Sequence, residues 1–159
     1  MIGGFLRSTA FRRLRQALGN RRGAVALEFG LLIPVLSTIV VGVTDLSIGF
    51  ARKMAVQDAA EAGAQYAALH GYSSGPISTA ITSATNLAGV TATPAPSSSC
   101  GCASGTSITA ATCGSTCASG RKAGTYVTSS ARYSYTMILN YPGLSNPVTL
   151  SAATTIRIQ

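Results

Sequence analysis

The sequence predicts an α+β protein, in which a long N-terminal transmembrane helix continues into a small C-terminal domain with a short helix and an antiparallel β-sheet. Three observations lead to this class. A charge-free apolar run extends from Phe29 to Thr44, an alanine-rich stretch follows it, and apolar and polar residues alternate through the last third of the chain. These patterns are typical of a membrane span, a helix and half-covered strands. The 159 residues are enough for one modest domain with its own core.

The apolar run has the length of one membrane span. It holds sixteen residues without a charge, and the five preceding residues, one of them acidic, extend it to twenty-one, from Ala24 to Thr44. At ~1.5 Å per residue this is roughly 31 Å of helix, close to the ~30 Å hydrocarbon core of a bilayer. We therefore expect a transmembrane helix over residues 24–46.

The charges are distributed unevenly along the chain. The net charge is +8, yet residues 1–23 contain no acid and all four acids lie between residues 28 and 61. Because positive charge favours the cytoplasmic side, we expect the N-terminus in the cytoplasm and the rest of the chain outside it. The leader arginines are expected to contact anionic lipid, and no nucleic-acid partner is expected. They are Arg7, Arg12, Arg13, Arg15, Arg21 and Arg22.

Glu28 is the one acid near the start of the apolar run. A carboxylate inside a bilayer costs a few kcal/mol on insertion scales, so it usually has a partner. A plain single-span anchor leaves Glu28 unexplained. An ordinary secretory signal would need a small-residue cleavage site after the apolar run, and residues Asp45–Phe50 contain none. If the chain were cut after Gly23, however, the new amino group of Ala24 could pair with Glu28 of a neighbouring subunit.

The segment Arg21–Phe29, followed by Leu31–Leu36, resembles the class III signal of type IV pilins and pseudopilins. The closest resemblance is to TadE-like pseudopilins of the tight-adherence (Tad/Flp) pilus system. The family pattern is a basic leader, a glycine before the cut, a glutamate at the fifth mature position, an aromatic residue after it, and an apolar helix kinked by an early proline. The matching residues after the leader are Gly23, Ala24, Glu28, Phe29 and Pro34.

The resemblance implies a pilin-like fold and a function in assembly. It implies that a prepilin peptidase removes the leader, residues 1–23, and that the chain enters the bacterial inner membrane with a periplasmic C-terminal domain. Other pilins or pseudopilins and the pilus assembly platform would be its partners in building an adhesive pilus. Because a major Flp pilin is far shorter, the length favours a minor pseudopilin. The alternative is a membrane-anchored periplasmic binding or adhesion protein that never enters a filament.

Residues 47–90 are expected to form a periplasmic helical region. The long helix should continue to His70 and end at the glycines of Gly71–Gly75. A second, short helix should begin near Pro76 and end near Gly89. Asp58 and Glu61 are expected on a solvated face. A weak apolar stripe consists of Phe50, Met54, Ala64 and Ala67 or Ala68.

Residues 91–124 are rich in Ser, Thr and Gly and predict a loop that contains four cysteines. The spacings Cys100-x-Cys102 and Cys113-x3-Cys117 are unusual for zinc, and the predicted compartment favours disulfides. A bond between Cys100 and Cys102 would be strained, so each disulfide should take one cysteine from each pair. A nested pairing suits a hairpin, and a crossed pairing stays open.

Residues 125–159 give the clearest strand signal. Period-two alternation over Ala131–Tyr141 and over Val148–Ile158, joined by a turn-rich connection at 142–147, predicts an antiparallel pair with one covered face. The tyrosines at 133, 135 and 141 should pack within this sheet. No catalytic residues, metal or cofactor are expected, because the lone His70 has no cluster of ligands and no Gly-x-Ser-x-Gly motif is present.

Overall fold

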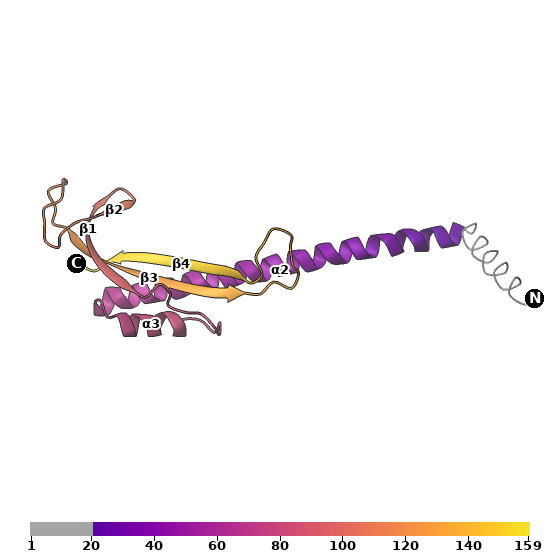
Figure 1. Cartoon of the computed structure of the whole chain (residues 1–159), viewed down its shortest axis with the longest axis horizontal. Coiled ribbons are helices and arrows are strands. Elements are labelled where there is room, and N and C mark those ends of the chain that lie inside the picture. The colour runs from indigo at the N-terminus through magenta and orange to yellow at the C-terminus, as the bar shows by residue number, and fades with distance from the viewer. Residues whose placement is uncertain (1–20) are drawn as a thin grey trace, which may run out of the picture. The chain divides into compact units, whose positions relative to one another are not determined.

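The computed structural model describes residues 21–159, and the α+β class is confirmed. The described residues divide into two units, 21–44 and 45–159. The predicted leader residues Arg12, Arg13 and Arg15 lie outside the described part. The elements, labelled in Figure 1, are α2 (Arg21–His70), α3 (Ser74–Ser83), β1 (Ser97–Ser104), β2 (Ser107–Ala110), β3 (Gly124–Tyr135) and β4 (Val148–Arg157).

In the first unit, residues 21–44 form the N-terminal part of α2. The helix continues past Pro34, and the hydroxyls of Ser37 and Thr38 donate hydrogen bonds to the carbonyls of Ile33 and Pro34. Such bonds inside a helix satisfy a hydroxyl without a partner from another segment. The kink expected at Pro34 stays a prediction.

In the second unit, α2 buries a face made of small residues. Asp58 and Glu61 lie on the opposite, exposed face, as predicted. Of the predicted apolar stripe, Ala64 and Ala67 are buried, whereas the side chains of Phe50 and Met54 are 70% and 58% exposed. The core lies close to the helix backbone, so side chains of alanine size are the ones that fit. The buried positions are Val56, Ala59, Ala60, Gly63, Ala64 and Ala67.

The short helix α3 differs from its prediction at its C-terminal end. Pro76 lies in its first turn, as expected, but the helix ends at Ser83, well before Gly89. Ile77 and Ile81 are fully buried, whereas Leu87 would lie roughly 80° away from Ile77 on a continued helix at ~100° per residue. Leaving the helix therefore lets Leu87 enter the same core, where it is 8% exposed.

The four strands form one antiparallel sheet in the order β2-β1-β3-β4. Alternate residues of β3 and β4 face the core, with Ala131 opposite Ala152 and Tyr133 opposite Leu150. The core joins these residues to α3 and to the second part of α2, and Figure 1 shows both helices on one side of the sheet. The predicted packing role of Tyr133 and Tyr135 is confirmed.

The prediction of a loop over residues 91–124 was wrong in part, because this segment contains β1 and β2. Ser97 to Gly101 pair with β3, and Gly101 to Ser104 pair with β2. These strands consist mostly of exposed Ser, Thr and Ala residues, so they show no apolar alternation. Their extended form comes from pairing with an apolar neighbour, which is a tertiary effect.

The strand predicted over Ala131–Tyr141 corresponds to β3, which begins earlier, at Gly124, and ends earlier, at Tyr135. After Tyr135, the main-chain N–H groups of Ile138 and Leu139 donate to the carboxylate of Asp45. The Asn146 side chain pairs with the main chain of Met137, accepting at 3.0 Å and donating at 3.3 Å. These side-chain partners replace the strand partner that a longer β3 would need.

The four cysteines form two disulfides, each with one member of each pair. The bonds are Cys100–Cys113 and Cys102–Cys117, with Cα–Cα separations of 5.1 and 5.7 Å. The pairing is therefore crossed, which is one of the two pairings that the sequence left open. β2, which has no cysteine, is the hairpin partner of β1. The segment Cys113–Cys117, which follows β2, is bonded to β1 with both running in the same direction: Cys113 is bonded to Cys100 and Cys117 to Cys102.

Candidate functional site

The residues of the predicted processing and assembly motif lie at the start of α2. Gly23 and Ala24 belong to its first turns, and Gly23 is half-buried. Glu28 follows about one turn later on an exposed position. Its carboxylate has no ion-pair or hydrogen-bond partner among the side chains that the structure describes. The structure therefore leaves Glu28 available to a group from outside this part of the chain.

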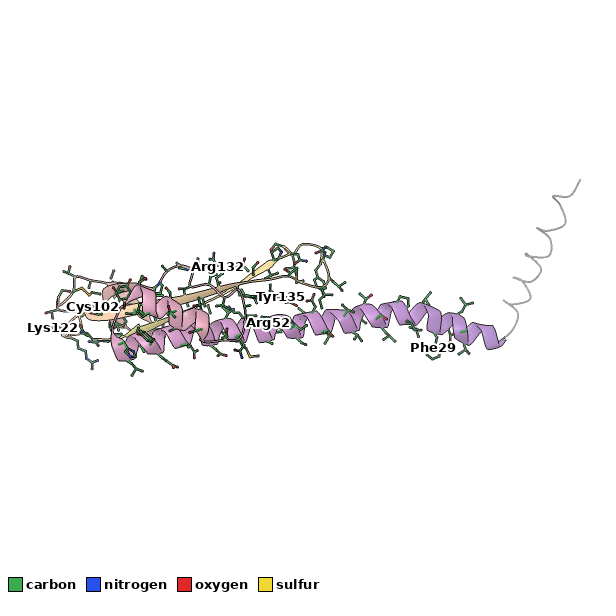
Figure 2. The ribbon with its side chains drawn as sticks, turned by 90° about the horizontal axis from the view of Figure 1, so that it is seen from below. Phe29, Arg52, Cys102, Lys122, Arg132 and Tyr135 are labelled. Atoms are coloured by element: carbon green, nitrogen blue, oxygen red, sulfur yellow. A yellow bond between two sulfur atoms is a disulfide. The ribbon has the colours of Figure 1, made fainter. Side chains whose placement is uncertain are left out.

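The apolar side chains beyond Glu28 are also exposed. Phe29 is 62% exposed and Leu31 is 75% exposed, and Figure 2 shows Phe29 on the outside of the helix. The most apolar window within Val25–His70 has a mean hydropathy of 2.1, and none of it is buried. By length and composition this helix can cross a membrane. Exposed apolar surface on this scale requires lipid or another protein to cover it.

Asp45 is a buried residue that the sequence analysis did not single out. Its side chain is 2% exposed, although it directly follows the charge-free run. The Tyr135 hydroxyl donates to Asp45 Oδ1 at 2.5 Å, while the N–H groups of Ile138 and Leu139 donate to Oδ2 at 3.1 and 3.4 Å. One carboxylate thus joins α2 to the end of β3 and to the connection that follows it. The one signal in the sequence is an acid between two apolar stretches.

The Asp45 carboxylate raises the pKa of two nearby tyrosines. The hydrogen bond from Tyr135 to Asp45, together with burial, raises the pKa of Tyr135 to about 12. Burial, and then the nearby charge of Asp45, raises the pKa of Tyr141. The Tyr141 hydroxyl is buried but forms no hydrogen bond of ordinary geometry. Tyr135 is therefore the tyrosine that holds the carboxylate directly.

The raised pKa of Tyr135 predicts how stability depends on alkaline pH. A folded-state pKa above the usual 10.0 means that the Tyr135 hydroxyl stabilises the fold fully below about pH 10. This contribution is lost as the pH rises toward about 12. We expect the stability difference between the native chain and Tyr135→Phe, measured by urea unfolding, to be constant up to pH 10 and to shrink above it. A difference that does not change up to pH 11.5 would contradict the assignment.

The chemistry of these groups is structural. Three donors satisfy the Asp45 carboxylate, so it is not available as a base. Within residues 21–159 there is no group of three or more metal-ligating side chains, and every cysteine is in a disulfide. The ring of His70 stacks on Tyr66 at the end of α2, with its Nδ1 3.2 Å from the Tyr66 carbonyl oxygen.

The described chain thus combines a helix that can cross a membrane with a small, disulfide-bonded α+β unit. Residues 23–65 match the family described as TadE-like protein. This match supports a TadE-like protein of the Tad pilus, a family of structural proteins. The match begins at Gly23 and lies within α2. No curated protein and no solved structure matches the chain.

Proposed function

We propose that this chain is a minor pseudopilin that works by assembly. A prepilin peptidase cleaves it after Gly23, and the mature chain lies in the bacterial inner membrane with residues 45–159 in the periplasm. There it joins other pilins or pseudopilins at the assembly platform of a Flp-type pilus for surface adhesion. The observation that carries the proposal is the exposed apolar surface over Val25–Val40 of the helix.

The position of Glu28 supports a specific role in assembly. After cleavage, the Ala24 amine is a positive charge at the membrane end of the helix, and Glu28 is an exposed carboxylate without a partner in the described part. Inside a membrane or a filament, either ion alone is expensive, and a pair with a neighbouring subunit removes most of that cost. The two disulfides are consistent with a periplasmic location, because disulfides persist in oxidising compartments.

The proposal predicts that Gly23→Leu blocks processing. A peptidase site that accepts a residue without a side chain has no room for a branched one, so this variant should keep its 23 leader residues. Intact-mass measurement of the membrane-extracted chain is the test. Gly30→Leu is the matched control, since it makes the same change in the same helix at a position with open space around it.

The processing result also separates the proposed function from the alternative of a permanently anchored adhesion protein. A mature chain that begins at Ala24 supports the pseudopilin. A native chain that begins at Met1, or a Gly23→Leu variant that still begins at Ala24, would overturn the proposed cleavage.

A further inference from the structure

An apolar groove opens beside α2 in the second unit, directly after the charge-free run. Its volume is about 500 Å³, within the range of ligand sites. Leu46, Gly49 and Phe50 line it from α2, and Leu144 and Leu150 line it from the C-terminal part of the chain. At Gly49 no side chain enters the groove, and an added Cβ would meet the Tyr135 ring at 3.6 Å, an ordinary van der Waals contact. Leu46, Phe50 and Leu144 are 59%, 70% and 59% exposed, so the groove is accessible from outside.

The charges around the groove favour an anionic head on an apolar ligand. Lys53 lies in the lining, and one of its ammonium hydrogens bonds to the Ser151 carbonyl, which leaves two further donors. Arg52 is close enough for its charge to act on Tyr135, and Figure 2 shows the two residues in the same region. Asp45 also lines the groove, but its carboxylate already accepts three hydrogen bonds.

The place of the groove along α2 selects the kind of ligand, given the membrane placement proposed above. Asp45 is the first residue after the apolar run, and Lys53 follows eight residues later, about 12 Å along a helix. The headgroup layer on each side of a bilayer is roughly 5–8 Å thick. The groove thus begins at the edge of the hydrocarbon core and ends, at Lys53, just beyond the level of lipid phosphates.

We propose that this groove binds one acyl chain of an anionic phospholipid, whose phosphate faces Lys53 and Arg52. The acyl chain lies along Phe50, Gly49 and Leu46 toward the apolar run. This contact covers the exposed apolar residues at the point where the helix leaves the membrane. It also holds the periplasmic unit at a defined depth on the membrane surface.

Native mass spectrometry of the full chain in detergent tests the proposal. The chain is mixed with phosphatidylglycerol or with phosphatidylcholine, and bound lipids are counted per chain. We expect one retained phosphatidylglycerol and clearly weaker retention of phosphatidylcholine. Gly49→Leu fills the groove and replaces a helical glycine by a better helix former, so the fold should be kept. We expect it to lower retention at least tenfold, whereas Gly30→Leu leaves retention unchanged.

The charge variants test the headgroup contact separately. Arg52→Gln combined with Lys53→Gln should reduce the preference for phosphatidylglycerol severalfold, and Arg132→Gln, an exposed arginine of β3, should not. Equal retention in Gly49→Leu and Gly30→Leu would overturn the proposal, as would a Gly49→Leu variant that loses self-association instead of lipid. A chain that is cleaved and membrane-inserted but retains no lipid refutes this inference alone. A chain that never enters the membrane refutes the proposed function.

Discussion

A Glu28→Ala variant is expected to be inserted and cleaved normally but to form almost no filaments. Removing one member of a buried ion pair costs about 3–5 kcal/mol, because the other charge is left unpaired. Since about 1.4 kcal/mol corresponds to a tenfold change, incorporation should fall at least a hundredfold. Counting pili by electron microscopy measures assembly, and the mass of the mature chain measures cleavage in the same cells.

Glu61→Ala is the matched control for this prediction. Glu61 is also an exposed acid of α2, but it lies in the second unit, far along the chain from the Ala24 amine. Its removal should leave both pilus number and cleavage unchanged. Normal piliation in Glu28→Ala would show that the acid has no role between subunits. Loss of cleavage in Glu28→Ala would instead assign it to peptidase recognition.

A Gly63→Val variant is expected to destabilise the second unit strongly. A Cβ at Gly63 would overlap Ser129 Oγ and would lie 2.5 Å from Ile81 Cγ1, so α2 would have to move away from both β3 and α3. Overpacking a core typically costs 1–3 kcal/mol, and the branched valine places the effect at the upper end, about 3 kcal/mol. For a unit of this size the midpoint of thermal unfolding should fall by roughly 10 °C.

Gly75→Val is the control for this second prediction. Gly75 lies in the first turn of α3, is exposed, and has no atom within 4 Å of an added Cβ. Its replacement should change stability by about 0.5 kcal/mol or less. Circular dichroism melts of both variants under non-reducing conditions make the comparison. Equal melting temperatures would mean that the close approach at Gly63 does not limit the packing of the helix.

Local patterns account for the parts of the fold that were predicted well. The long helix was predicted to end at His70, and α2 ends there, because helix formers lead up to a glycine that takes a positive φ of 78°. The alternation in Val148–Ile158 similarly located β4 to within one residue. In both cases the controlling residues are neighbours in the chain, so a single sequence contains the signal.

Where prediction failed, a distant residue decides the local structure. β1 and β2 have no apolar alternation and depend on pairing that begins at β3. Which face of α2 is buried depends on how closely Ile81 and Ser129 approach Gly63, and the apolar stripe does not show this. The crossed disulfides accompany a hairpin in which β2, and not the segment Cys113–Cys117, pairs with β1. The spacing of the cysteines does not predict this pairing.

The sequence by itself determined the membrane-length helix, the basic N-terminal segment, the Gly23–Phe29 motif and the α+β class. Each depends on residue type and spacing over a short stretch. Only the tertiary structure decided the role of Asp45 and the groove beside Gly49. The partners of Asp45 are Tyr135, Ile138 and Leu139, at least 90 residues away in the chain. Whether a carboxylate is buried, and whether a glycine leaves a cavity, depends on the segments that fold against it.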